Sequence, residues 1–397
     1  MVVFKRLLAL LATLALSVWV AWRGGKGIDY TEDARPAVDA LAGGDLGAFL
    51  ERQPLMGSFS VLVRAPFAAL SGDGLTSYRL GAVACLVAGG LLGLWVAKLM
   101  RERGRPPLER VLVWALCAAS PMALNAVLWG HPEETLGGAL CVAAVIAAGR
   151  DRPLVAAVAL GLALGTKQWA VIAIVPVLMA APRRRVVLAS VAAVIALVLT
   201  VPFVVGSPES FETNTVNASQ TYDEVRPLSV YWLVSPETTR EVFDGVATRT
   251  VSEPTLPRWL GRIPHPLIVL LPIPLGLLLA RRRPEARDAL GMLALLLLAR
   301  CALDPVDNGY YHVPFLLALA SWEGLRREGL PLLSLLAATV LWVMVRHVPA
   351  DQVDAASAAY LAWAFATAAV VARAVYGRGG EREPAPARTA ATLPAHN

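Results

Sequence analysis

Arginine or lysine occurs in every second connection between the apolar segments of this 397-residue chain. A membrane span needs roughly 17 to 25 apolar residues, so the longer segments predict transmembrane helices. The shorter segments predict helices whose ends are shielded inside a bundle or around a water-filled cavity. The sequence therefore predicts an all-α fold, a polytopic transmembrane helical bundle of about 12 spans. The candidate spans are 4–22, 77–99, 108–128, 134–149, 153–166, 168–181, 185–205, 265–280, 287–303, 310–323, 329–346 and 355–376.

The composition excludes a soluble globular protein. Hydrophobic residues make up 56% of the chain and charged residues 17%, and a soluble protein of this length needs a largely polar exterior. The net charge of +6 would favour nucleic acid if it lay in one soluble patch, but the basic residues are distributed between apolar segments. The four cysteines lie in or beside apolar segments, which predicts free, buried thiols.

The basic connections predict the orientation of the chain. The positive-inside rule places them in the cytoplasm, whereas the short connections 130–134 and 304–309 contain no lysine or arginine. Twelve spans with both termini in the cytoplasm satisfy this alternation, and Lys167 and Arg346 are the exceptions. The abundance of Ala, Leu, Arg, Gly and Pro favours a bacterium with a GC-rich genome. We therefore expect a multi-pass protein of the bacterial plasma membrane.

Two long segments, 23–76 and 206–262, lie on the predicted outer side. Residues 59–70 are too few to span and include Arg64, which predicts an amphipathic helix along the membrane interface. Residues 1–376 form the predicted transmembrane domain. The tail 377–397, rich in Pro, Ala, Arg and Glu and without an apolar face, is predicted to be disordered in the cytoplasm.

Unusual polar residues gather on the predicted outer face, which indicates one extracytoplasmic active site. Asp29 and Asp33 follow the first apolar segment. A carboxylate at such a surface is suited to act as a general base toward a sugar or lipid hydroxyl. Two alternatives are a solvated loop carboxylate and an N-cap for a helix beginning near Arg35, a role that suits Asp33 better than Asp29.

A second polar group lies in the turn that contains His131, Glu133 and Glu134. An imidazole and carboxylates suit a divalent ion, although the spacing is not that of a zinc protease. In the alternative, Pro132 begins a helix and the two glutamates complement its positive end. The sequence requires no cofactor and leaves a divalent metal open.

Lys167, followed by Gln168, joins two short apolar segments and is one of four lysines in the chain. A lysine at membrane depth is costly unless it is paired or hydrated. Its ammonium is therefore predicted to hold the phosphate of a lipid carrier. The alternative is that its side chain extends to the outer headgroups.

Further polar residues flank the connection 304–309. Arg300 and Asp304 are four residues apart, so they are predicted to pair on one helix face, either structurally or beside the substrate. Tyr311 and His312 begin the next apolar segment. The pair Tyr310 and Tyr311 is typical of an interfacial anchor. His312 is a candidate for contact with a phosphate or hydroxyl.

Together these features resemble the GT-C superfamily of membrane glycosyltransferases. The chain is most similar to the bacterial polyprenyl-phosphate-mannose-dependent mannosyltransferases, of the family 87 type. The resemblance covers most of residues 1–376. Its motifs are Asp29 after the first segment, the Arg-Ala-Pro-Phe stretch at 64–67, the turn 130–134, the Lys167 turn and the Tyr-Tyr-His stretch at 310–312.

The resemblance implies transfer of a sugar, commonly mannose, from a polyprenyl phosphate to a glycolipid or polysaccharide acceptor outside the cytoplasm, with inversion. It implies that Asp29 is the catalytic base, with Asp33 as the second candidate. The base would remove the acceptor proton while cations stabilise the departing phosphate, with Lys167 as the first choice and His312 as the second. Asp29 is followed by a tyrosine rather than a second acid, which leaves metal dependence open.

The implied partners are the lipid-linked donor, the glycan acceptor and the bilayer, without nucleic acid. A membrane transporter or lipid flippase is the alternative, because it also places ionisable residues in a central cavity. No internal repeat is evident, which counts against transporter folds built from duplicated halves.

Overall fold

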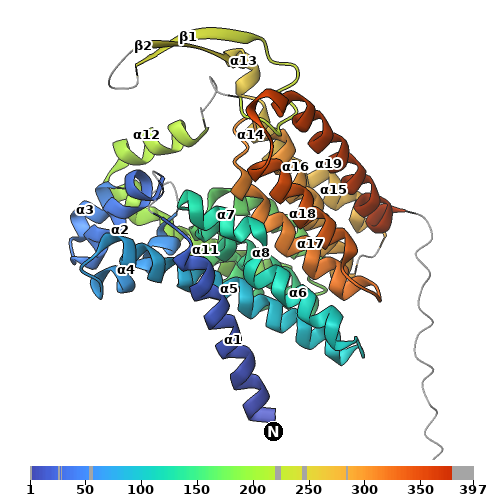
Figure 1. The fold of residues 1–397 in the computed structure, drawn as a ribbon. Helices are drawn as coiled ribbons and strands as arrows, with labels where there is room; N and C mark the ends of the chain where they lie inside the picture. Colours follow the sequence, from blue (N-terminus) through green and yellow to red (C-terminus); the bar gives the residue numbers. More distant parts are fainter. Residues whose placement is uncertain are drawn as a thin grey trace, which may run out of the picture.

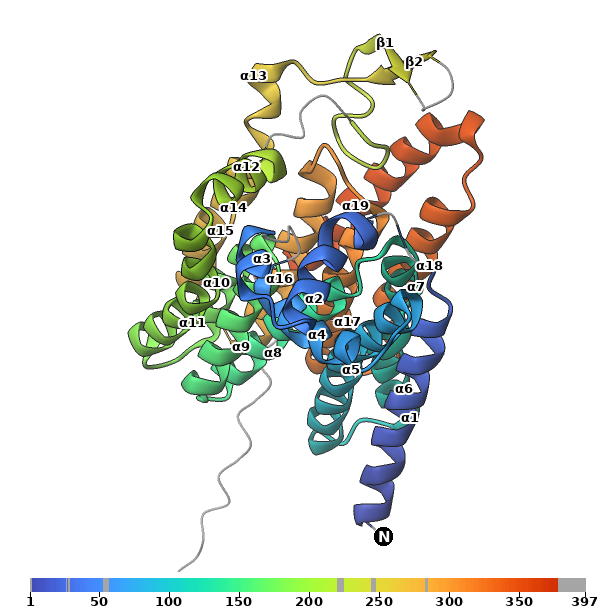
Figure 2. The same cartoon turned by 90° about the vertical axis from the view of Figure 1, so that its left-hand side faces the viewer.

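A computed structural model describes residues 2–25, 27, 29–52, 57–219, 225–243, 248–282 and 285–377. These residues form one helical bundle, so the predicted all-α class is confirmed (Figures 1 and 2). An antiparallel hairpin of β1 (Glu237–Phe243) and β2 (Thr248–Pro254), which was not predicted, lies at the opposite end of the molecule from the N-terminus. Except for Gly377, the predicted disordered tail lies outside the described residues.

Six helical stretches of the described chain are long and apolar enough to cross a membrane. Each coincides with a predicted span. They are α1 (Val2–Trp22), α5 (Gly74–Glu102), α6 with α7 (Pro107–Ala119 and Pro121–Trp129), α11 (Arg185–Gly206), the series α13, α14 and α15 (Arg258–Gly261, Pro264–Leu270 and Pro272–Ala280), and α19 (Val353–Tyr376).

The other six predicted spans are also helical, but each has 18 residues or fewer, so the count of twelve remains a prediction. Three of them are buried along nearly their whole length, and protein surrounds the polar residues Glu133, Glu134 and His312 at the starts of two of them. The six are α8 (Glu133–Gly149), α9 (Pro153–Thr166), a 3-10 turn with α10 (Gln168–Ala173 and Ile174–Ala180), α16 (Ala286–Leu303), α17 (His312–Arg326) and α18 (Leu332–Arg346). Two further 3-10 turns are Gly309–Tyr311 and Ala350–Gln352.

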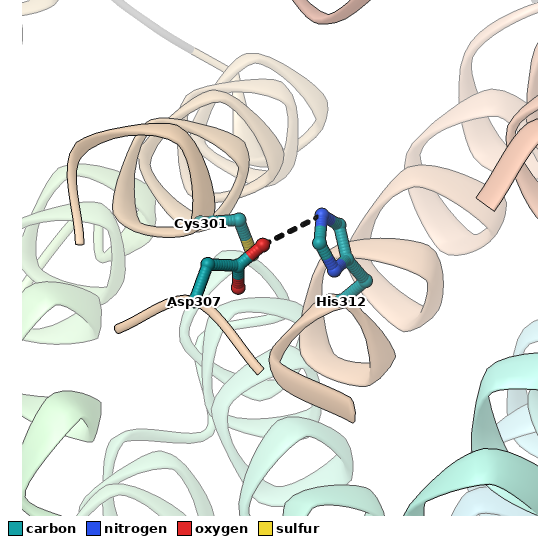
Figure 3. Close-up of side chains that lie close together, drawn as sticks. All are labelled: Cys301, Asp307 and His312. Carbon is teal, nitrogen blue, oxygen red and sulfur yellow. Dashed lines mark ion pairs between the residues drawn. The ribbon is translucent and has the colours of Figure 1, made fainter. Parts of the chain in front are cut away.

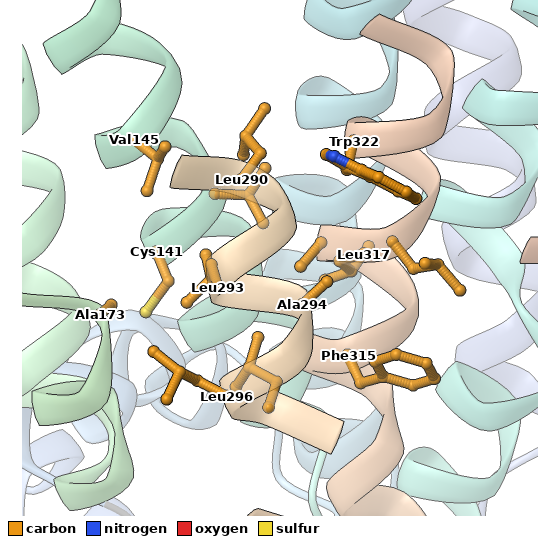
Figure 4. Packing of buried hydrophobic residues seen from close by; sticks show 14 of the residues in the cluster. Cys141, Val145, Ala173, Leu290, Leu293, Ala294, Leu296, Phe315, Leu317 and Trp322 are labelled. Carbon is orange, nitrogen blue, oxygen red and sulfur yellow. The ribbon is translucent and has the colours of Figure 1, made fainter. Parts of the chain in front are cut away.

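The three buried helices, α8, α16 and α17, form the centre of the bundle. Leucines of α16 point toward Cys141 on one side and toward Phe315 on the other (Figure 4). A Cβ atom built on Gly138 of α8 would lie 2.9 Å from the Pro314 Cα atom on α17. The absence of a side chain at Gly138 therefore allows the two backbones to approach closely, as is usual between membrane helices.

Replacing Gly138 with valine is expected to lower the free energy of unfolding by about 1–3 kcal/mol, because the added atoms have no space between α8 and α17. Thermal unfolding in detergent measures the change. Gly47, on the helix α3 (Leu46–Glu51), is the matched control, since a Cβ atom there would make only an ordinary contact at 3.5 Å. Equal melting temperatures for Gly138→Val and Gly47→Val would contradict the close packing.

The described residues of the first long segment, 23–76, form short helices beside the bundle (Figure 1). They are a π-helical turn (Tyr30–Ala34), α2 (Arg35–Ala42), α3 and α4 (Ser58–Ala69), and α12 (Pro208–Ser219) follows α11 in the second long segment, 206–262. Val38 and Val61 pack with Phe203 of α11. The helix predicted at 59–70 is confirmed as α4, and its position along the membrane interface stays a prediction. Its Arg64, however, does not face the interface: it is 3% exposed and pairs with Glu133 of α8.

Candidate active site

A tight turn after α7 brings Asp29 next to the turn that contains His131 and Glu133. Gly130 ends α7 in the left-handed region at φ +96°, which favours glycine. A Cβ atom there would lie 2.8 Å from the backbone nitrogen of Tyr30. The turn that follows can therefore lie directly against the backbone next to Asp29.

At this contact, a series of hydrogen bonds runs from Asp29 at the surface through His131 to Glu133 inside the bundle. The Nε2 atom of His131 lies 2.8 Å from Oδ2 of Asp29, and its Nδ1 atom lies 2.8 Å from Oε1 of Glu133. Both acceptors are carboxylates, so both ring nitrogens donate and the imidazole is positively charged. Asp29 is 35% exposed at its side chain, whereas Glu133 is fully buried. Asp29 is thus the solvent-accessible end of this hydrogen-bonded series.

The surroundings of Asp29 and Asp33, the two candidate bases, shift their pKa values in opposite directions. The hydrogen bond from His131 holds the pKa of Asp29 below its ordinary value, so this carboxylate is ionised at neutral pH. Burial raises the pKa of Asp33. Ala34 rather than Asp33 is at the N-cap of α2, and no side chain caps that helix among the described residues. The capping alternative for Asp33 is therefore wrong.

Two buried glutamates bind the cations of the site. Lys167 Nζ lies 3.1 Å from Glu133 Oε1 and 3.6 Å from Glu134 Oε1. Glu133 also accepts a hydrogen bond from Arg64, and Arg300 Nη1 lies 3.8 Å from Glu134 Oε2. Lys167 thus points inward to carboxylates, and the alternative in which it extends to the headgroups is wrong.

We call these side chains the charged cluster. With His131 protonated, it contains one more cation than anions, and this excess suits a phosphate diester. The carboxylates are Asp29, Glu133 and Glu134, and the cations are Arg64, His131, Lys167 and Arg300.

Aromatic side chains lie beside the charged cluster. Tyr310 stacks on His131 with ring centroids 4.1 Å apart. The guanidinium of Arg300 lies 4.0 Å from the ring centroid of Tyr311 and 4.9 Å from that of Trp169. Such rings hold a cation in place where little water reaches it.

Three further predicted site residues are Arg300, Asp304 and Gln168. Arg300 and Asp304 do not form the predicted ion pair. Arg300 pairs with Glu134, whereas Asp304 accepts a hydrogen bond from the Val306 backbone nitrogen at 3.0 Å. The reason is that α16 ends at residue 303, so Asp304 no longer lies on the helix face of Arg300. Gln168 is exposed next to Lys167.

His312 lies in a separate buried group rather than in the charged cluster. Its Nε2 atom is 2.7 Å from the Tyr360 hydroxyl and 3.7 Å from Asp307 Oδ2 (Figure 3). Cys301 lies next to both (Figure 3). The His312 side chain is completely buried, so it has no open path to a substrate in this conformation.

Comparison with known proteins adds the family. A model of glycosyltransferase family 87 matches residues 57–305. The chain belongs to glycosyltransferase family 87. The predicted resemblance is therefore confirmed, and the membrane-bound fold is of the GT-C type. No curated protein matches the chain.

This family 87 glycosyltransferase is similar to two solved structures. One is ArnT from Cupriavidus metallidurans bound to undecaprenyl phosphate, at 18% identity and a TM-score of 0.52, covering 94% of this chain and 71% of that chain. The other is the apo state of ArnT from Cupriavidus metallidurans, at 16% identity and a TM-score of 0.46, covering 95% and 78%. At these identities the likeness establishes the fold alone.

The family match covers only part of the site of this family 87 glycosyltransferase. His131, Lys167 and Arg300 lie inside the matched residues, whereas Asp29 and Asp33 precede them. The assignment of the base therefore depends on the geometry around Asp29.

Arg226 was missed by the sequence reasoning. Its backbone nitrogen donates to the Pro305 carbonyl at 2.8 Å, and its side chain donates to Asn308. Its positive charge also helps to keep the pKa of Asp29 low. Several arginines occur in the segment 206–262, so no spacing or composition signal distinguishes Arg226 from the others.

The metal predicted as an option at His131, Glu133 and Glu134 does not fit the geometry. Both nitrogens of His131 are already hydrogen-bonded to carboxylates. Lys167 and Arg64 lie where a divalent ion would approach Glu133. These cations compensate the buried carboxylates, and a further divalent ion would be repelled.

The unfolding free energy should depend on pH through His131. Burial lowers the pKa of His131, but the nearby carboxylates of Glu133 and Asp29 outweigh this and raise it above 6.5. The stabilisation is therefore complete below pH 6.5 and is lost as the pH rises through the raised pKa. Denaturation at increasing pH should show this loss in the wild type and not in His131→Gln. His347, which is exposed, provides the control variant His347→Gln, which should keep the wild-type pH dependence. The same pH dependence of the unfolding free energy in His131→Gln and the wild type would contradict the assignment to His131.

Proposed function

We propose that this family 87 protein transfers a sugar from a polyprenyl phosphate to the hydroxyl of a glycolipid or polysaccharide acceptor, with inversion. Mannose is the first candidate sugar. Family membership gives glycosyl transfer. A donor carried by lipid agrees with an enzyme of membrane helices, and ArnT, which shares the fold, was solved with undecaprenyl phosphate.

The observation that carries this proposal is the position of Asp29 at the accessible end of the charged cluster. Asp29 accepts the proton of the acceptor hydroxyl while the oxygen attacks the anomeric carbon. The bond from that carbon to the phosphate oxygen breaks in the same displacement. His131 orients Asp29 and keeps it ionised, and such positioning is what a general base requires.

The cations of the cluster take the second role. The departing lipid phosphate gains negative charge, and fixed cations stabilise that charge in the transition state. Lys167 and Arg300 supply this stabilisation, because Glu134 holds both side chains in fixed positions. The lipid chain lies in the bilayer and holds the donor in register.

We place the reaction on the extracytoplasmic face, with both termini in the cytoplasm, because the basic connections alternate with the connections that carry the cluster. The transporter alternative has no comparable support, since the family match is to glycosyltransferases.

The test uses purified protein in lipid nanodiscs with a glycolipid acceptor. Polyprenyl-phosphate mannose and polyprenyl-phosphate glucose are compared with a nucleotide-activated mannose. We expect a glycosidic product of inverted configuration with a lipid donor and none with the nucleotide sugar. Transfer from the nucleotide sugar in the absence of any lipid donor would contradict the proposed donor class.

A further inference from the structure

The buried group around His312 differs in chemistry from the charged cluster. A thiol, a carboxylate and an imidazole converge there, and their ligand atoms lie within 4.8 Å of one another (Figure 3). The three residues are Cys301 on α16, Asp307 in the following loop and His312 at the start of α17. The mechanism proposed above uses none of them.

Asp307 is the residue of this group whose carboxylate lacks hydrogen bonds. Its side chain is completely buried, and neither carboxylate oxygen has a hydrogen-bond partner within the described part of the chain. A buried carboxylate without hydrogen bonds is costly, so a native protein normally pairs it or binds a metal with it. The nearest imidazole nitrogen, Nε2 of His312, is 3.7 Å away.

His312 is oriented as a metal-ligating histidine would be. Its Nδ1 atom lies 3.2 Å from the carbonyl oxygen of Gly309 and donates to it. That hydrogen bond leaves the lone pair on Nε2, the nitrogen that faces Asp307, and carbonyl acceptors of this kind commonly fix the tautomer of a ligating histidine. The Tyr360 hydroxyl, 2.7 Å from Nε2, donates a hydrogen bond to this lone pair, so a bound ion would take the place of that hydrogen bond.

We propose that Cys301, Asp307 and His312 bind one zinc ion. Thiolate, imidazole and carboxylate are the ligand types that zinc accepts in proteins. The ion binds Cys301 as a thiolate and Asp307 as a carboxylate, so the protons held by these two groups are released to solvent. Two negative ligands then neutralise the ion, so the buried complex carries no net charge. Tetrahedral ligand atoms around zinc are about 3.4 Å apart, close to the 3.7 Å between Asp307 and His312.

The position of the ion gives it a structural role. Cys301 follows Arg300 directly, and His312 follows Tyr311, the aromatic residue against which Arg300 lies. The ion would join the end of α16 to the start of α17 and thereby fix Arg300 beside Glu134. The site itself does not depend on the proposed sugar transfer.

The test measures metal in the full-length protein, expressed in medium with added zinc and purified without a histidine tag. After a chelator wash we expect about one zinc ion per chain in the wild type and at least a tenfold lower content in Cys301→Ala. Cys141→Ala is the control, because Cys141 is equally buried but lies outside the group. Zinc content in the wild type no higher than in Cys301→Ala would overturn the proposal.

Cobalt gives a second readout that does not require Cys301→Ala to fold. Protein produced with cobalt should show the strong near-ultraviolet charge-transfer band of a cobalt–thiolate bond, in the wild type and in Cys141→Ala. Asp307→Asn should weaken metal retention at least tenfold while keeping the thiolate available. Absence of the band in cobalt-grown wild-type protein would mean a hydrogen-bonded group without metal, whatever the outcome of the transfer assay.

Discussion

Replacing Asp29 with asparagine is expected to lower kcat for sugar transfer by about 10²–10⁴-fold, the usual contribution of a general base. Asparagine keeps the size of the side chain and can still bond to His131, but it cannot accept the acceptor proton at neutral pH. Transfer from polyprenyl-phosphate mannose under saturating donor measures the effect. The binding of donor should change little, because Asp29 is assigned to the acceptor side.

Two neighbouring aspartates serve as comparisons for this result. Asp39 is 53% exposed and pairs with Arg35 on the surface, so Asp39→Asn should transfer sugar like the wild type. Asp33→Asn tests the reserve base. If Asp33→Asn loses transfer and Asp29→Asn keeps it, Asp29 is not the base.

Replacing Glu133 with glutamine is expected to destabilise the protein by about 3–5 kcal/mol, the range found when one partner of a buried ion pair is removed. The substitution leaves Arg64 and Lys167 facing a neutral amide inside the bundle, with His131 beside it. Thermal unfolding in detergent measures the loss, and transfer should fall with it because the cations are no longer fixed.

Glu102 is the matched control for Glu133. It is 44% exposed and lies 3.8 Å from both Lys98 and Arg150. Surface pairs contribute about 0–1 kcal/mol, so Glu102→Gln should unfold close to the wild type. An Arg64→Gln, Glu133→Gln double variant that is more stable than Glu133→Gln alone would support direct pairing. Wild-type stability of Glu133→Gln would contradict the buried network.

Much of the fold could be predicted because lipid imposes strong constraints on sequence. Apolar length and the positions of basic residues are local properties, and all twelve predicted segments are helical in the structure. Lys167 could be selected as a site residue for the same reason, since a lysine between two apolar segments needs a partner. Its partners, Glu133 and Glu134, were predicted as site residues from a different stretch.

Other features depend on contacts between distant segments and leave little local signal. Arg64 appears as an interfacial residue in sequence, and only the packing of α4 against α5 and α9 makes it a buried partner of Glu133. Asp307 and Cys301 meet because a loop returns over the end of α16. The hairpin of residues 237–254 follows from pairing between two polar stretches with no apolar alternation to reveal it.

The binding of undecaprenyl phosphate to Lys167→Gln tests most directly whether the charged cluster receives a lipid phosphate. Lys98, which is 58% exposed on α5, provides the control variant Lys98→Gln. We expect a dissociation constant at least about tenfold higher for Lys167→Gln and an unchanged one for Lys98→Gln, measured in nanodiscs with both variants folded. Equal affinity of Lys167→Gln and the wild type for undecaprenyl phosphate would contradict phosphate binding by the charged cluster.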